Sequence, residues 1–188
     1  MKKNLFYLLV YAVCINIILV VTYYLYKHFN NQPYIAIFVT ICMIASHSNI
    51  RIIIGLIVPL FVSRHNIDAK IHRVSNLEYK FLTKLGVKRY KDKYFAYDRS
   101  QFVIANINKE SIEVALRNNI NAELVHILCF LFSTLSILFG YLLSKDELII
   151  YIITFIIAAV FIDIIPITIQ RYNRYRLLKI NSRFEKMA

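Results

Sequence analysis

Four long apolar runs dominate this sequence, covering residues 4–26, 33–62, 122–143 and 148–169. A helix needs about 20 mostly apolar residues to cross the hydrocarbon core of a bilayer, and each run reaches that length. Hydrophobic residues make up 59% of the 188 residues, more than one soluble core of this size can enclose. The sequence therefore predicts an all-α membrane protein with about four transmembrane helices, and a soluble globular domain is a poor alternative.

The first run and the last two runs predict regular crossings. Run 4–26 follows only two lysines and lacks the small residues of a cleavage site, so we expect a retained helix rather than a signal peptide. Runs 122–143 and 148–169 are separated only by residues 144–147. So short a connection predicts an antiparallel helical hairpin with a tight turn.

Polar residues interrupt the second run. His47, Asn49 and Arg51 lie near its middle, and Gly55 and Pro59 follow. This pattern predicts one broken helix or two half-helices, and interrupted membrane helices often mark binding positions. His47, Asn49 and Arg51 are therefore candidate substrate-binding residues, although a purely structural role fits the same pattern.

Lysine and arginine residues predict the orientation in the membrane. Residues 63–121 hold twelve and the tail after Ile169 holds six, whereas the two opposite loops hold only Lys27 and Lys145. Because the basic excess lies on the cytoplasmic side, we expect a multi-pass cell-membrane protein with both termini in the cytoplasm. The net charge of +12 mostly reflects this asymmetry, which favours contacts with anionic lipids over a nucleic-acid partner.

The runs and charges divide the chain into three segments. We expect an N-terminal transmembrane hairpin at 1–63, a cytoplasmic interfacial segment at 64–121, and a C-terminal transmembrane hairpin with a basic tail at 122–188. Within the middle segment, residues 64–86 repeat apolar residues at steps of three and four with basic residues between them. This pattern predicts an amphipathic helix that either lies in the membrane interface or packs on the rest of the protein. A loop and then a helix capped by Asn108 should follow.

Ionisable residues inside the apolar runs are the main candidates for chemistry, because burying them in a bilayer is costly. Glu123 and His126 are three apart on one helix face, and the predicted hairpin brings His126 to the depth of Asp163. Polar residues follow the fourth run and should lie at the cytoplasmic mouth of the hairpin: Gln170, Arg171, Asn173 and Arg174. The sequence therefore predicts a polar cluster at the inner leaflet.

Two other interpretations of this cluster remain open. Glu123 can extend to the interface while His126 packs and the arginines anchor the helix end, which is a structural role only. Glu123, His126 and Asp163 can also bind one metal ion, but the second Glu-x-x-His of a di-metal bundle is missing. We expect no metal and no cofactor.

Several short motifs resemble one known family. They are A-E-L-V-H at 122–126, Q-R-Y-N-R-Y-R-L at 170–177 and V-K-R-Y-K-D-K at 87–93. Together they resemble the glycosyl-4,4'-diaponeurosporenoate acyltransferase family over roughly residues 85–180. These membrane enzymes esterify a fatty acyl chain onto the glucose of a carotenoid glycoside in staphyloxanthin-type biosynthesis. The family pattern has tryptophan at Tyr90 and commonly asparagine at Asp163.

The resemblance implies an O-acyltransferase at the cytoplasmic face. Acyl transfer to a sugar hydroxyl needs a base for the hydroxyl proton, and a histidine with a pKa near neutrality is the usual choice. His126 is the expected catalytic base, with Glu123 or Asp163 orienting its ring.

The same resemblance suggests the other roles and the partners. Asn173, Arg171 and Arg174, beside Gln170, are expected to bind the developing oxyanion or the phosphates of a donor. The acceptor would be a membrane lipid, glycolipid or carotenoid glycoside, and the donor an acyl thioester such as acyl-CoA or acyl carrier protein. The alternative class is a non-enzymatic membrane accessory or immunity protein that acts through a partner.

Overall fold

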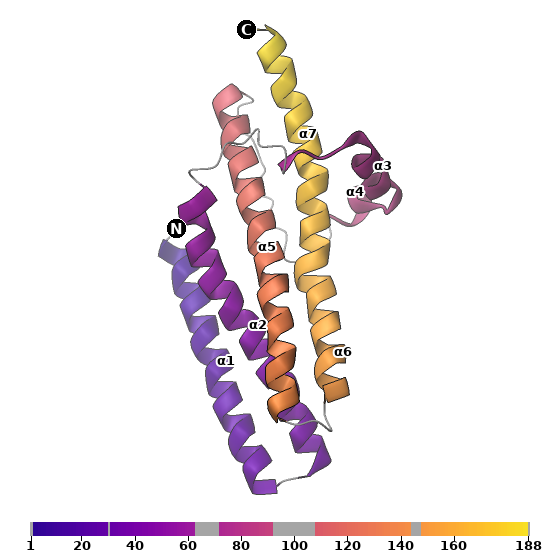
Figure 1. Cartoon of the computed structure of the whole chain (residues 1–188). Helices are drawn as coiled ribbons and strands as arrows, with labels where there is room; N and C mark the ends of the chain where they lie inside the picture. Colours follow the sequence, from indigo (N-terminus) through magenta and orange to yellow (C-terminus); the bar gives the residue numbers. More distant parts are fainter. Residues whose placement is uncertain (1, 30, 63–71, 92–107, 144–147, 188) are drawn as a thin grey trace. The chain divides into compact units, whose positions relative to one another are not determined.

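The computed structural model describes residues 2–29, 31–62, 72–91, 108–143 and 148–187, and these residues form helices and no strand. Two long helices come first, α1 (Lys2–Phe29) and α2 (Gln32–Val62). Two short ones follow, α3 (Asn76–Lys84) and α4 (Val87–Tyr90). The last part contains α5 (Lys109–Leu143), α6 (Leu148–Ala158), the π-helix η3 (Ala159–Ile164) and α7 (Ile165–Met187). Figure 1 labels the α-helices. The predicted all-α class is confirmed.

Three helical segments of the described chain are long and apolar enough to cross a membrane: Val10–Phe29, Pro33–Phe61 and Leu148–Phe184. They mark the protein as membrane-associated. The fourth predicted crossing, residues 122–143, forms the second half of α5, so the helix expected after Asn108 and this run make one element. Its crossing of the bilayer stays a prediction, and the predicted turn at 144–147 lies outside the described residues.

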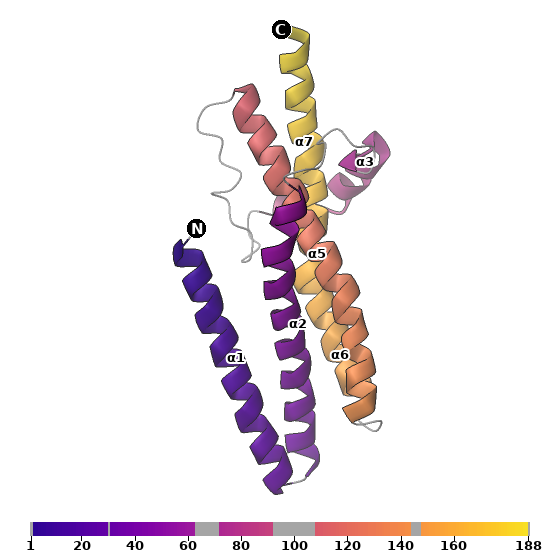
Figure 2. The ribbon, with the colours of Figure 1, turned by 60° about the vertical axis from the view of Figure 1, so that its left-hand side comes forward.

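The break predicted in the second run is wrong, because α2 is a single helix from Gln32 to Val62. Its polar side chains bond to α1 while the backbone stays helical. Tyr11 and Ser48 share a hydroxyl hydrogen bond of 3.0 Å. The side-chain amides of Asn16 and Asn49 exchange bonds of 3.1 and 3.2 Å. Partners on a neighbouring helix thus remove the reason to unwind, and α1 runs beside α2 in Figures 1 and 2.

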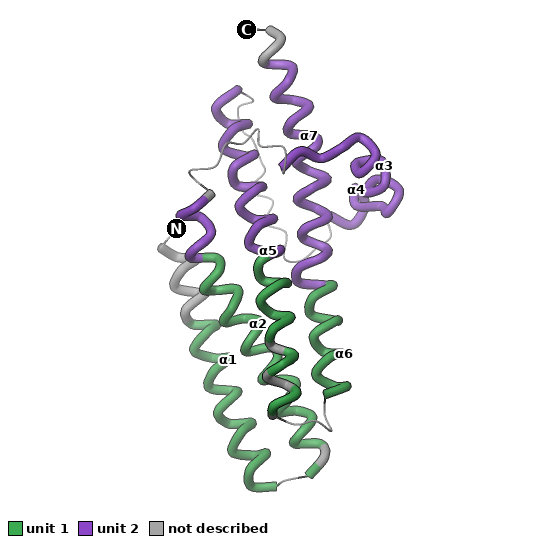
Figure 3. The backbone as a smooth tube through the Cα atoms, viewed as in Figure 1, with its two compact units in different colours: residues 1–55, 128–160 green, residues 56–127, 161–188 purple. Residues whose placement is uncertain are grey.

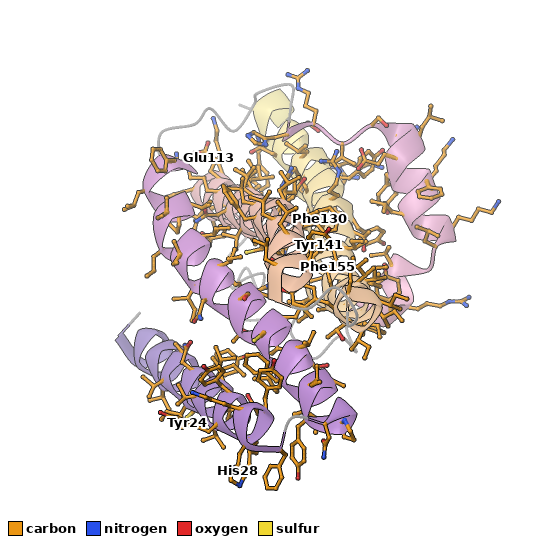
Figure 4. All side chains as sticks on the ribbon, turned by 60° about the horizontal axis from the view of Figure 1, so that its bottom comes forward. Tyr24, His28, Glu113, Phe130, Tyr141 and Phe155 are labelled. Atoms are coloured by element: carbon orange, nitrogen blue, oxygen red, sulfur yellow. The ribbon has the colours of Figure 1, made fainter. Side chains whose placement is uncertain are left out.

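The chain divides into two compact units that are each discontinuous in sequence (Figure 3). Unit 1 contains Met1–Gly55 and Leu128–Val160. Its core joins Val39 and Met43 of α2 to Tyr151 and Phe155 of α6 and to Ala159. Phe130 of α5 packs beside Phe155 with ring centroids 6.3 Å apart, and both are labelled in Figure 4. Many large apolar side chains of α1 and α6 are exposed outside this core, as lipid-facing helices require.

Unit 2 contains Leu56–Ile127 and Phe161–Ala188. Its apolar core holds α3 and α4 against α7 through Leu82, Val87, Ile169 and Tyr172. Aromatic rings extend this contact, because Tyr79 stacks on Tyr172 and on Tyr175 with centroids 5.2 and 4.0 Å apart. The Tyr90 hydroxyl lies 3.0 Å from that of Thr168.

The amphipathic helix predicted at 64–86 is shorter than expected. Residues 63–71 lie outside the described residues, residues 73–75 are not helical, and α3 begins only at Asn76. Ser75 is the reason, since its hydroxyl accepts a 3.1 Å bond from the backbone N–H of Glu78 and caps the helix. Gly86, with φ of 78°, then ends α3 and turns the chain into α4.

The predicted cap at Asn108 is confirmed. The Asn108 side chain accepts a 2.8 Å bond from the backbone N–H of Ser111, and the Ser111 hydroxyl accepts a 3.1 Å bond from the Asn108 N–H. This reciprocal pair fixes the start of α5. Because the start of α5 is fixed, so is the position of each later residue around the helix axis, including Glu123 and His126 on one face.

Candidate active site

Polar contacts join α5 to η3 and α7 within unit 2. Asn119, Glu123 and His126 lie four and three residues apart and so share one face of α5. Opposite them η3 supplies Asp163, and α7 supplies Gln170, Arg171 and Arg174. We call these seven residues the polar ladder.

The innermost contact of the polar ladder is between His126 and Asp163. Nδ1 of His126 lies 3.3 Å from Oδ1 of Asp163, and the two side chains are 10% and 0% exposed. A buried carboxylate that accepts from Nδ1–H fixes the imidazole tautomer, so that the lone pair is on Nε2. The contact expected from the hairpin geometry is thus confirmed, and Asp163, not Glu123, is the residue that meets the imidazole.

Asp163 occupies the π-helical segment η3, which ends two residues before Pro166. Proline lacks a backbone N–H and its ring clashes with the carbonyl four residues earlier, which disfavours a regular α-helical turn before it. A π-turn accommodates the misfit and occurs often at functional sites. The sequence around Pro166 therefore determines the backbone from which Asp163 projects.

Glu123 is the centre of an ionic cluster. Arg171 Nη1 donates a 2.8 Å hydrogen bond to Glu123 Oε1, and Nη2 of Arg174 pairs with the other carboxylate oxygen. Arg171 also engages Glu78 of α3 through Nε and, at 2.9 Å, through Nη2. Two carboxylates therefore balance two guanidinium groups, which makes burial of the cluster tolerable.

Arg174 is the most enclosed member of this cluster, with 1% of its surface exposed. Besides Glu123 it reaches Asn119, whose Oδ1 accepts from Nε at 3.0 Å, and the His72 carbonyl, which accepts from Nη1 at 3.3 Å. Asn119 in turn donates to the backbone carbonyl and to Oε1 of Gln170, at 3.0 and 2.6 Å. The guanidinium thus connects α5, α7 and the segment before α3.

The ion pair between Glu78 and Arg171 affects titration. Donation from the Arg171 guanidinium lowers the pKa of Glu78 below its ordinary value of 4.5, against the opposing effect of partial burial. The docked state of α3 therefore favours the ionised carboxylate.

The remaining predicted site residues are not members of the polar ladder. Asn173 is on α7 in unit 2 and is buried. His47, Asn49 and Arg51 belong to α2 in unit 1, where His47 is buried and Asn49 pairs with Asn16. Their assignment as substrate-binding residues stays a prediction.

The metal interpretation finds no geometric basis in the part of the chain that the structure describes, since no group of three histidine, cysteine or acidic side chains there is arranged to hold an ion. Glu123 turns to the arginines, whereas His126 and Asp163 turn to each other.

Sequence reasoning missed Glu78 and Asn119. Asn119 precedes Glu123 by four residues and His126 by seven, so its position on the same helix face was available from the spacing. Glu78 fits the capping pattern Ser-x-x-Glu, and nothing near it in sequence points to a partner 93 residues away.

A helical membrane protein with a buried histidine–carboxylate pair beside an ionic cluster has the features of a membrane enzyme site. The family model for glycosyl-4,4'-diaponeurosporenoate acyltransferase matches residues 68–183, which include the whole polar ladder. The chain belongs to this acyltransferase family. No curated protein and no solved structure matches the chain.

Proposed function

We propose that this protein is an integral-membrane acyltransferase that transfers a fatty acyl group to a sugar hydroxyl of a carotenoid glycoside or a related glycolipid. The family's name supplies both the reaction type and the glycosylated carotenoid acceptor. The observation that carries the proposal within this chain is the buried pair of His126 and Asp163, next to the ionic cluster.

In this proposal His126 is the catalytic base. Asp163 accepts from Nδ1–H and holds the ring, so Nε2 takes the proton of the acceptor hydroxyl. The resulting oxygen nucleophile attacks the thioester carbonyl carbon of the donor, and a C–O bond forms. The C–S bond then breaks, and the imidazolium returns the proton to the leaving thiolate. The sum is an ester and a free thiol, so neither cofactor nor metal is required.

In this proposal Arg171 and Arg174 mainly hold the helices of the site in place, and binding of the donor is secondary. Their donors are engaged by Glu78, Glu123 and Asn119, so a phosphate of the donor has to compete with carboxylates already in place. Asn173 and Gln170 are the proposed donors to the oxyanion of the tetrahedral intermediate, because both lie on α7 beside the cluster.

The proposed site opens to the cytoplasm, and both termini face the same side. The support is the excess of lysine and arginine in residues 63–121 and in the tail. A basic surface there would attract an acidic donor such as acyl-CoA or acyl carrier protein, while a lipid-like acceptor would enter from the bilayer.

The test uses purified protein in nanodiscs with labelled acyl-CoA or acyl carrier protein and, as acceptor, either the glycosylated carotenoid or a bacterial glycolipid extract. We expect a labelled ester with the natural protein and none with His126→Ala. Thr134→Ala is the matched control, because Thr134 is exposed on α5 and bonds only to its own helix. Absence of ester with every donor and acceptor pair would favour a non-enzymatic accessory protein instead.

A further inference from the structure

Helix α3 has two different apolar faces. One face docks on α7 through Glu78, Tyr79 and Leu82. A second stripe repeats every fourth residue on the exposed side: Leu77, Phe81 and the C-cap residue Leu85 are 80%, 59% and 52% exposed. Three large apolar side chains in one exposed row on a short helix require a partner that covers them.

Basic residues border this stripe. At 100° per residue, Lys80 and Lys84 project next to Leu77 on the side away from the docked face, and both are exposed. The short helix α4 adds the exposed Lys88 and Arg89. The single acidic residue of α3 and α4 is Glu78, and Arg171 neutralises it. The outer face of these helices is therefore cationic as well as apolar.

The level at which α3 and α4 dock on α7 is also informative. Their contacts involve Thr168, Ile169, Arg171, Tyr172 and Tyr175. The apolar run of the last helix ends at Ile169 in the sequence. A run of that length is just enough to cross the hydrocarbon core, which is about 30 Å thick. Residues 168–175 therefore correspond to the region where acyl chains give way to headgroups.

We propose that α3 and α4 (residues 76–90) form a membrane-interface anchor whose occupant is the surface of an anionic phospholipid bilayer. Leu77, Phe81 and Leu85 insert at the boundary of acyl chains and headgroups, and Lys80 and Lys84 extend to lipid phosphates. An apolar stripe bordered by lysines is the pattern of helices that lie in this plane. The anchor needs no acyl transfer and is independent of the proposed function.

The experiment measures the depth of single fluorophores. In full-length protein with Cys14, Cys42 and Cys129 replaced by serine, an NBD group is attached at Phe81→Cys or, as matched control, at Thr83→Cys. Thr83 is exposed on the same helix but lies about 160° away from Phe81 around the axis. Both proteins are reconstituted in vesicles of phosphatidylcholine with phosphatidylglycerol that contain lipids spin-labelled at a shallow acyl carbon.

We expect quenching at position 81 to exceed that at position 83 at least threefold. It should fall when phosphatidylglycerol is omitted, and also when Lys80→Gln and Lys84→Gln are combined. Leu77→Cys provides a second probe on the stripe should Phe81→Cys reconstitute poorly. Equal quenching at 81 and 83 would overturn the proposal. A blue-shifted probe at 81 that lipid spin labels do not quench would also overturn it, and would point to a protein partner.

Discussion

Nδ1 of His126 lies 3.3 Å from the carboxylate of Asp163, although 37 residues separate them in the chain. The carboxylate is fully buried, and the imidazole nearly so. In a medium of low dielectric constant, a hydrogen bond between two such groups is electrostatically stronger than in water. The pair is therefore the centre of the first prediction.

His126→Ala should lower acyl transfer at least 100-fold, the usual contribution of a general base. Asp163→Asn should lower it only about tenfold, since an amide oxygen can still accept from Nδ1–H and orient the ring. The measurement is ester formation per mole of folded protein, with folding checked by gel filtration in detergent. Full activity of His126→Ala would leave the pair a structural role.

The second prediction concerns acidification and the docking of α3. Because the pKa of Glu78 is lowered below 4.5, its stabilising effect is complete above that pH and is lost as the pH falls through the lowered pKa. The chain has no tryptophan, so Tyr90→Trp on α4 provides a single emitter at the contact with α7. Its emission should shift to the red only as the pH falls below 4.5.

A matched variant separates this ion pair from general acid unfolding. In Tyr90→Trp with Glu78→Gln, emission should already be red-shifted at pH 7 and should change little on acidification. The same titration curve with and without Glu78→Gln would assign the pH dependence to other groups.

The third prediction compares two arginines of α7 that lie two residues apart and therefore project from nearly opposite sides of the helix. Arg174 is buried and bonds to Asn119, Glu123 and the His72 carbonyl, whereas Arg176 is exposed. Lysine cannot reproduce a forked contact, so Arg174→Lys should destabilise the protein by about 2–4 kcal/mol. Arg176→Lys should cost less than about 0.5 kcal/mol. Thermal unfolding in detergent measures both, and equal small effects would indicate plain anchoring.

The fourth prediction tests the amide pair of Asn16 and Asn49. Interhelical hydrogen bonds in membranes contribute about 0.6 kcal/mol on average and up to about 1.7 kcal/mol. A double-mutant cycle with Asn16→Ala and Asn49→Ala should give a coupling energy in that range. Thr22→Ala is a suitable control, because Thr22 bonds only to carbonyls of its own helix. Additive effects at positions 16 and 49 would argue against a direct pair in solution.

The fifth prediction concerns topology. In a cysteine-free background, a cysteine at Lys88 of α4 should react with a membrane-impermeant maleimide only after cells are permeabilised. A cysteine at Asp146 should react in intact cells, as the distribution of basic residues predicts. The reverse pattern would invert the proposed orientation.

The sequence was sufficient to predict the helical class and the meeting of His126 with Asp163. Both depend on regular geometry, since apolar runs reveal crossing helices and the helical rise gives the depth of each residue in a hairpin. The Asn108 cap was equally local. The cap depends only on residues within one turn of the helix, and the contact of His126 with Asp163 depends on counting along two regular helices joined by a short turn.

Features that depend on distant partners were not predictable in this way. The polar middle of α2 predicted a break, yet Tyr11 and Asn16 on α1 give Ser48 and Asn49 their hydrogen bonds and the helix continues. The amphipathic pattern around Glu78 left open whether its helix lies in the membrane interface or packs on the protein, and it gave no sign of the pair that Glu78 forms with Arg171. These partners cannot be deduced from the periodicity of the sequence. Periodicity shows which residues share one face of a helix, but not which other part of the chain packs against that face.

The ionic cluster also has a consequence for the order of events during synthesis. Glu78 and Glu123 leave the ribosome before Arg171 and Arg174, the residues that neutralise them. Until α7 is made, two carboxylates that are destined for burial remain without their counterions and must stay hydrated or protonated. The site therefore assembles only when the last helix arrives, so a nascent chain stalled before Arg171 would hold Glu78 and Glu123 without the arginines that pair with them.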